Sequence, residues 1–228
     1  GNVLDRLTAE NTFTSQTSRK LARIVLAQYF SAALFMPYGQ FLAAAREFRY
    51  DIAMLGHRFR TSFEQVVHRL STLRRPGSEG IPIFMVRTDL AGNISKRFSA
   101  NGFRVSRFLG TCPKWGLFQA FITPGMIRTQ ISEIPSGDRF FSISRTVRHH
   151  EGGHNQESTL HAITFGCRIE DAENLVYADS IDLNAAPTPI GVSCQICPRT
   201  DCAQRAFPQH QKPIQINENI RNSSLYTT

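Results

Sequence analysis

The sequence lacks long uninterrupted hydrophobic runs, and this limits the class of protein it can encode. Its longest apolar stretch, residues 21–36, contains Arg23 and Gln28 and is followed by Pro37. A membrane-spanning helix needs about 20 mainly apolar residues, so this stretch is too short to cross a bilayer. No secretory signal peptide is recognisable at the N-terminus. We therefore expect a cytoplasmic protein with no membrane partner.

Acidic residues are scarce relative to basic ones. The chain has 26 Lys and Arg residues against 18 Asp and Glu, which gives a formal charge of +8 and a pI near 9.7. This imbalance favours an anionic partner, such as nucleic acid or a phosphorylated small molecule. Glycine-rich phosphate loops are absent, and no nucleophile and base stand in a known catalytic order. These absences argue against a nucleotide hydrolase and against a triad enzyme.

Cysteine is also rare, yet three of the five cysteines are crowded together. Cys194, Cys197 and Cys202 have C-x₂-C-x₄-C spacing, while Cys112 and Cys167 lie well upstream. Thiolates at such spacing can converge on one point, as a soft metal ion or an iron–sulfur cluster requires. Free thiols at ligand spacing also fit a reducing compartment. We predict one metal centre held by these three residues.

A fourth ligand has to come from elsewhere in the chain. Cys112 and Cys197 are both followed by proline, a feature shared with the last cysteine of the bacterial ferredoxin run. We therefore expect Cys112 to be the fourth ligand and an iron–sulfur cluster, of the 4Fe–4S type, to be the occupant, with zinc as the alternative. Cys167 stands in an apolar stretch typical of a buried residue, and it remains the reserve ligand.

Two other motifs suggest functions that the surrounding residues do not favour. His150, Glu151 and His154 match the H-E-x-x-H pattern of zinc hydrolases, but two glycines interrupt the helix that this pattern needs. Residues 51–73 resemble a DNA-binding helix-turn-helix with a basic second helix. An ordinary helical hairpin accounts for the same residues.

Basic and aromatic side chains alternate in the central part of the chain. Such a mixture suits a ligand that carries phosphates and a stackable ring, such as coenzyme A or a short acyl-CoA, and it also suits single-stranded nucleic acid. For an acyl-CoA we expect phosphate contacts from some of these cations and an apolar space for the acyl end. The phosphate candidates are Arg87, Lys96, Arg97, Arg107 and Arg145, and the acyl-site candidates are Phe84, Phe103 and Phe108.

Hydrophobic periodicity predicts an α+β fold. Residues 16–73 have helical spacing, with a capping box at Thr61 and Glu64, and a breaker-rich boundary follows at 75–80. Strands are expected at 81–87, 94–99, 139–148 and 160–168, and a helix with a break at 115–130. Two further expectations are a short helix at 170–176 and a loose tail after 208.

Several stretches resemble the C-terminal region of the short-chain fatty acyl-CoA regulators, bacterial transcription factors of acetate and propionate metabolism. The similarity covers most of residues 10–210. The stretches are 21–23 (LAR), 29–34 (YFSAAL), 36–38 (MPY), 63–65 (FEQ), 68–70 (HRL), 84–89 (FMVRTD), 92–97 (GNISKR), 110–113 (GTCP), 175–179 (LVYAD) and 194–208 (CQICPRTDCAQRAFP).

This resemblance implies a domain plan. Residues 1–75 would be the helical remnant of an IrrE-type peptidase-like domain, 76–207 an acyl-CoA-sensing α+β domain with the cysteine motif, and 208–228 a tail. Since the chain opens with Gly1, we expect it to be a fragment of a longer protein. The resemblance implies that an N-terminal domain, absent here, would bind operator DNA. The resulting hypothesis is a non-enzymatic effector sensor, with a second copy of the chain in a homo-oligomer as a candidate partner. The alternatives are a zinc hydrolase using His150, Glu151 and His154, or a pure iron–sulfur redox sensor without a small-molecule ligand.

Overall fold

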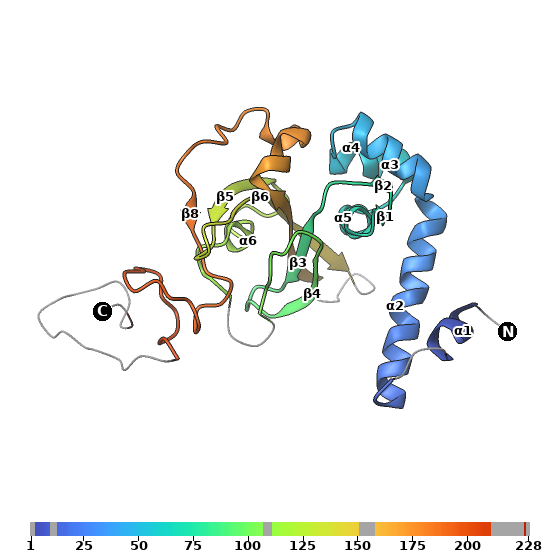
Figure 1. The fold of residues 1–228 in the computed structure, drawn as a ribbon, viewed down its shortest axis with the longest axis horizontal. Helices are drawn as coiled ribbons and strands as arrows, with labels where there is room; N and C mark the ends of the chain where they lie inside the picture. The colour runs from blue at the N-terminus through green and yellow to red at the C-terminus, as the bar shows by residue number, and fades with distance from the viewer. Residues whose placement is uncertain (1–2, 10–12, 107–110, 151–157, 211–225, 227–228) are drawn as a thin grey trace, which may run out of the picture.

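A computed structural model describes residues 3–9, 13–106, 111–150, 158–210 and 226. Helices fill the N-terminal third and a mixed sheet follows, so the predicted α+β class is confirmed (Figure 1). The N-terminal helices are α1 (Val3–Ala9), α2 (Gln16–Phe35), α3 (Tyr38–Glu47), α4 (Ile52–Phe59) and α5 (Phe63–Ser71).

Local sequence signals set most of the helix boundaries. Pro37 is the N-cap of α3 and separates it from α2, since proline suits the start of a helix and not its interior. Asp51 caps α4 through its side chain. At α5 the capping box is formed by Ser62 and Gln65, not by Thr61 and Glu64 as the sequence suggested. The box thus lies one residue later, and Glu64 is left for another role.

Helix α5 belongs to the core and is not shaped to read DNA. Val66, Val67 and Leu70 are fully buried. Arg69, a basic residue of this helix, is only 2% exposed and donates to the Met36 carbonyl oxygen at 3.0 Å. Burial of this basic side chain favours the ordinary helical hairpin for residues 51–73 over a DNA-reading helix-turn-helix.

A six-stranded sheet forms the second half, with strand order β4-β3-β7-β6-β5-β8. All neighbouring strands are antiparallel except β5 and β8, which are parallel. The strands are β3 (Phe84–Thr88), β4 (Ile94–Ser99), β5 (Arg128–Glu133), β6 (Arg139–His150), β7 (Ser158–Arg168) and β8 (Thr188–Pro189). A small hairpin of β1 (Arg74–Arg75) and β2 (Ser78–Glu79) stands at the predicted boundary between helices and sheet.

The helix expected at 115–130 is largely wrong. Only α6 (Gly116–Gln119) is helical, and residues 128–133 instead form β5, paired with β6. A strand's tertiary pairing overrides weak helical periodicity here. After β7 the chain makes two 3₁₀ turns, η1 (Ile169–Asn174) and η2 (Val176–Ala178), close to the predicted short helix.

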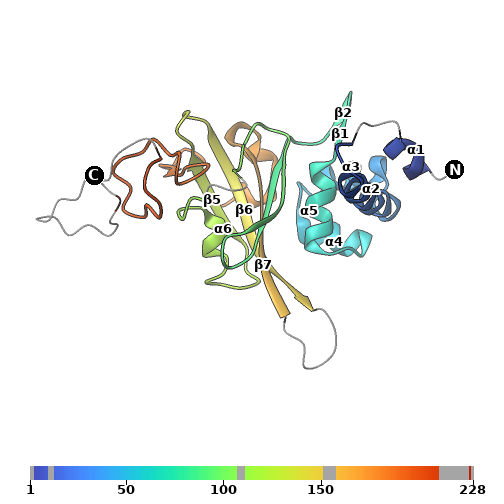
Figure 2. The same ribbon diagram turned by 90° about the horizontal axis from the view of Figure 1, so that it is seen from below.

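The sheet separates two hydrophobic cores. Phe141, Ile143 and Phe165 pack with α3, α4 and α5 in the larger core, and the helices lie together beyond that side of the sheet in Figure 2. Phe84 and Phe140 point the other way, into a smaller core beside α6. Alternation of side chains along a strand explains how adjacent residues enter opposite cores.

Helix α2 projects from the rest of the molecule (Figure 1), and none of its side chains is buried. Within the described residues, no single helix has both the length and the apolar composition of a membrane span. Only α2 and α3 taken together, with a 66° bend between them, reach that length and composition.

Candidate functional site

The cysteine motif lies in the long loop after β8, beside α6. Cys112 and Cys194 are buried, and Cys197 and Cys202 are half-buried. Burial raises the pKa of the Cys112 thiol, and the nearby thiols of Cys202 and Cys194 raise it further, while the backbone amides of Gly191 and Lys114 oppose the rise. The fold therefore brings Cys112 within electrostatic range of two members of the motif.

Close backbone packing supports this cysteine group. The backbone N–H of Ala206 donates to Cys194 Sγ at 3.3 Å. A Cβ atom on Gly191 would stand 2.9 Å from Cys197 Sγ, so a larger residue at this position would require the sulfur to shift. The Trp115 indole Nε1–H donates to the Gly191 carbonyl oxygen at 3.1 Å and fixes the turn to the smaller core. Hydrogen bonds to the sulfur atoms are one of the features by which proteins tune thiolate-held clusters.

Cys167 lies apart from the other four cysteines. It is fully buried on β7 opposite Phe141, within the larger core, where burial raises the pKa of its thiol well above the usual range. The described residues contain no group of three or more His, Cys, Asp or Glu side chains already arranged to hold a metal ion. The thiols are thus gathered on one loop and its neighbour without forming a closed ligand shell.

A basic groove lies at the junction between the helices and the sheet. Its cavity volume is about 550 Å³, and its walls come from α2, α5, β3, β4 and β6. Glu64 of α5 accepts from Arg87 Nη1 and from Lys96 Nζ, each at 2.8 Å, and lies 3.1 Å from His149 Nε2. A pocket of a few hundred Å³ with convergent polar groups is typical of a small-molecule site.

Burial and nearby charges shift the pKa values of ionisable groups in and beside the groove. Burial alone would raise the pKa of Glu64, but the hydrogen bond from Lys96 and the charges of Lys96, Arg87 and His149 bring it below its ordinary value. Burial and the positive charge of Lys96 lower the pKa of His68. Burial and the charge of Arg87 likewise lower that of His161. One buried carboxylate therefore stands among groups of mostly positive charge.

The predicted phosphate contacts do not form one set. Arg87 and Lys96 pair across β3 and β4 and face α5 together, whereas Arg97 pairs with Val86 and faces the opposite way, donating to the Val105 carbonyl oxygen. Arg145 lies on the helix side of β6, over the ring of Phe63. Arg107 and Phe108 lie outside the described residues. Adjacent strand residues point to opposite faces, so Lys96 and Arg97 cannot share one phosphate site.

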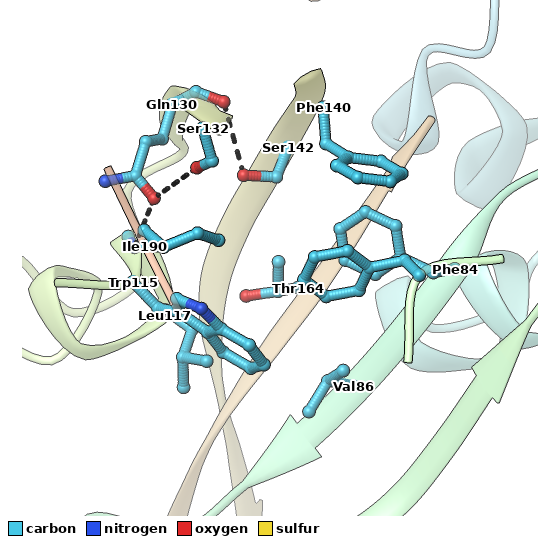
Figure 3. A pocket seen from close by; sticks show the side chains of 12 residues that line it. Phe84, Val86, Trp115, Leu117, Gln130, Ser132, Phe140, Ser142, Thr164 and Ile190 are labelled. Carbon is cyan, nitrogen blue, oxygen red and sulfur yellow. Dashed lines mark hydrogen bonds between the residues drawn. The ribbon is translucent and has the colours of Figure 1, made fainter. Parts of the chain in front are cut away.

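Phe84 and Phe103, two of the predicted acyl-site residues, lie in the smaller core. Phe84 and Phe103 stack with ring centroids 4.2 Å apart and are 3% and 2% exposed. The cavity that they line with Trp115 and Phe140 (Figure 3) has a volume of about 20 Å³, room for roughly one water molecule. Its polar wall is self-satisfied, because Ser132 Oγ donates to the Gln130 side chain at 3.1 Å. This cavity is therefore too small for an acyl chain, whereas Phe103 also lines a cavity of about 630 Å³ together with Phe98 and Ile196.

The H-E-x-x-H pattern does not begin on a helix, because His150 is the last residue of strand β6. Glu151 and His154 lie outside the described residues. Two residues that the sequence did not single out for the site, Glu64 and His149, instead stand at the centre of the groove. Neither had a detectable signal, because their partners are distant in sequence and meet only in the folded chain.

Comparison with known proteins assigns the chain to a family. The model of the "Short-chain fatty acyl coenzyme A regulator, C-terminal" family matches residues 72–226, and that of the "IrrE N-terminal-like domain" matches residues 2–71. The chain belongs to the short-chain fatty acyl coenzyme A regulator family. The resemblance stated from the sequence motifs is therefore confirmed.

Relatives of this chain are named as transcription regulators and not as enzymes. It is 42% identical to the HTH-type transcriptional regulator RamB of Mycobacterium tuberculosis over 99% of its length and 48% of that protein's. It is 44% identical to the propionyl-CoA carboxylase regulator of Cereibacter sphaeroides, covering 94% of this chain and 46% of the relative. The chain thus spans about half the length of the curated relatives it matches.

A solved structure also resembles this family member. A Mycobacterium tuberculosis transcriptional regulator superimposes with a TM-score of 0.92 at 42% sequence identity, covering 99% of this chain and 69% of the other. The arrangement of helices and sheet described above is therefore that of a transcription regulator of known structure.

Proposed function

We propose that this chain is the effector-sensing part of a transcription regulator of short-chain fatty acid metabolism, and that it binds coenzyme A or a short acyl-CoA. The membership of the family and the printed names of its relatives support this role. Operator DNA would be bound by a part of the protein outside this chain. The chain itself would carry out no chemical reaction.

The observation that carries the proposal is the convergence of Arg87 and Lys96 on Glu64 in the groove. A phosphate or pyrophosphate of the ligand would compete with the Glu64 carboxylate for these two cations, because charge-assisted hydrogen bonds to phosphate are among the strongest available. Glu64 belongs to α5, whereas its partners belong to β3 and β4. Ligand binding here would therefore change how the helices are held against the sheet.

Calorimetric titration with propionyl-CoA tests this site. Loss of one charge-assisted contact costs about 1.5–3 kcal/mol, so Lys96→Ala should weaken binding about ten- to a hundredfold. Arg97→Ala is the matched control, because it removes a cation from the adjacent position on the opposite face. No heat with the wild-type protein would refute the acyl-CoA proposal. Equal weakening by both variants would refute the assignment to this groove.

We also propose that Cys112, Cys194, Cys197 and Cys202 hold an iron–sulfur cluster, with 4Fe–4S favoured and zinc as the alternative. The grouping of Cys112 with Cys194 and Cys202, the N–H···S bond from Ala206 and the glycine beside Cys197 support this donor set. Bound to these thiolates, the cluster would supply one-electron redox sensitivity.

Anaerobic purification and absorbance spectroscopy test the centre. A cluster gives a brown protein with thiolate-to-iron absorption near roughly 400 nm, whereas a zinc site is colourless. Cys202→Ser should abolish metal content and destabilise the C-terminal loop, because metal-binding free energy contributes to folding. Cys167→Ala serves as the control and should retain the metal. Full iron and zinc content in Cys202→Ser would refute the site.

One observation favours a second function, a redox sensor without a small-molecule ligand. Glu64 already accepts hydrogen bonds from both Arg87 and Lys96, so these two cations have a partner without any effector. An intact cluster in a protein that gives no heat with propionyl-CoA, coenzyme A or acetyl-CoA would select this alternative.

A further inference from the structure

One arginine connects all three cysteines of the motif through the backbone. The guanidinium of Arg205 donates to the carbonyl oxygens of Cys194 and Cys197, each at 3.2 Å. The backbone N–H of Arg205 donates to the Cys202 carbonyl oxygen at 2.9 Å. The next residue, Ala206, donates its N–H to Cys194 Sγ. Residues 205–206 therefore contact each of the three predicted ligands.

The same guanidinium also joins other parts of the cysteine loop. It also donates to the carbonyl oxygens of Arg199 and Phe207, and Arg205 is only 5% exposed. Arginine offers five N–H donors in a rigid planar arrangement, which suits a point where several carbonyl groups converge. A lysine ammonium has the same charge but cannot span these acceptors in one plane. A surface arginine would bond mainly to water, whereas this buried guanidinium bonds to four carbonyl groups of the loop.

We infer that Arg205 is a positioning residue for the metal centre: it holds the cysteine loop in its folded course before a cluster binds, and its buried charge raises the reduction potential of the bound cluster. The second half of the inference rests on the proposed function, since it needs the cluster. The first half does not, because it concerns the backbone of the loop. Groups that orient metal ligands from outside typically change metal affinity about 10- to 100-fold when removed.

Hydrogen exchange of the cluster-free protein tests the first half. In Arg205→Met the backbone amides of residues 194–207 should lose protection, while those of β6 and β7 exchange as in the wild type. Arg199→Met is the matched control, since it also removes a cation from this loop. The Arg199 side chain contacts Glu133 and not the backbone of the cysteines. Unchanged protection in Arg205→Met, or equal loss in both variants, would overturn the positioning role.

Anaerobic reconstitution with iron and sulfide tests the second half. Arg205→Met should lose its cluster about 10- to 100-fold faster than the wild type and show a more negative reduction potential. Arg205→Lys, which keeps the charge, should recover the potential while still losing the cluster quickly. A wild-type potential in Arg205→Met would overturn the electrostatic part.

If the wild-type protein takes up no cluster, the proposed metal centre is refuted, and the hydrogen-exchange experiment still decides the role of Arg205 in the loop. If Arg205→Met does not fold, Arg205→Lys carries the same exchange comparison.

Discussion

At the scale of single residues, Glu64 makes ionic contacts between the helices and the sheet. Its side chain is 9% exposed and contacts groups on three strands: Arg87, Lys96 and His149. A buried carboxylate with several cationic partners contributes stability only while it is ionised, and removing it leaves its partners without compensation. The residue is thus expected to govern both stability and its dependence on pH.

The pKa of Glu64 lies below its ordinary value of 4.5, which fixes the sign of this dependence. Its contribution is fully present above the unfolded-state pKa and is lost as the pH falls through the lower, folded-state value. We expect Glu64→Gln to lower the free energy of unfolding at pH 7 by about 1–3 kcal/mol. The measurement is urea denaturation from pH 7 to pH 3, and the variant should lose less stability than the wild type below pH 4.5.

The lowered pKa values of His68 and His161 add a second component at higher pH. A histidine kept neutral by burial favours the unfolded state once the pH falls below its ordinary value of 6.5. Stability should therefore begin to decline near pH 6.5 in the wild type and in Glu64→Gln alike. A Glu64→Gln profile parallel to the wild type over the whole range would contradict the role assigned to Glu64.

At the scale of elements, the start of α5 distinguishes two neighbouring hydroxyl residues. Ser62 makes the capping box with Gln65, whereas Thr61 Oγ1 reaches only the Met36 sulfur at 3.7 Å. Loss of an N-cap side chain costs about 1 kcal/mol. Ser62→Ala should therefore lower the denaturation midpoint clearly more than Thr61→Ala. Equal effects would show that the cap geometry is not the source of stability.

Two glycines in regular elements should respond in opposite directions to replacement by alanine. A Cβ on Gly166 of β7 would lie 2.4 Å from the Phe141 carbonyl oxygen and 2.8 Å from Phe84 Cε1, whereas one on Gly39 of α3 meets nothing within 4 Å. Gly166→Ala should destabilise the sheet by roughly 3 kcal/mol or more, as overpacking against backbone does. Gly39→Ala should raise stability by about 0.5–1 kcal/mol. Thermal unfolding followed by circular dichroism measures both.

At the scale of the whole molecule, the helices and the sheet are joined by a shared core. Phe41, Leu55 and Val67 of the helices belong to the same buried cluster as Phe141 and Phe165 of the sheet. The smaller core on the other side of the sheet contains the single tryptophan, Trp115. Both cores depend on β6 and β7, so neither should persist without the other.

This shared core predicts that the N-terminal helices and the sheet unfold together. Far-ultraviolet circular dichroism reports mainly on the helices, and Trp115 fluorescence reports on the smaller core. We expect the two signals to change at the same urea concentration, because coincident transitions are the mark of a two-state domain. Separate midpoints would mean that the helices and the sheet unfold independently despite their common core.

Local patterns were sufficient for most of the helices and strands and for the cysteine motif. The 3.6-residue period of residues 16–73, the proline at 37 and the alternation at 139–148 and 160–168 depend on neighbouring residues only, and the structure contains the corresponding helices and strands. The spacing of Cys194, Cys197 and Cys202 is likewise local. The family motifs are short runs of consecutive residues, and the family assignment they suggested is confirmed.

Contacts between residues far apart in the sequence decided strand β5, the position of Cys112 and the composition of the groove. Residues 128–133 became a strand because β6 offered a partner, and Cys112 stands near the cysteine loop because α6 and β8 bring the two segments together. The alternation along β4 separated Lys96 from Arg97 onto opposite faces, and only the position of α5 determined which face became a groove. Glu64 gained its role from cations on strands far along the chain. A sequence specifies local conformation directly, but the distance between two remote side chains depends on how all the intervening elements pack.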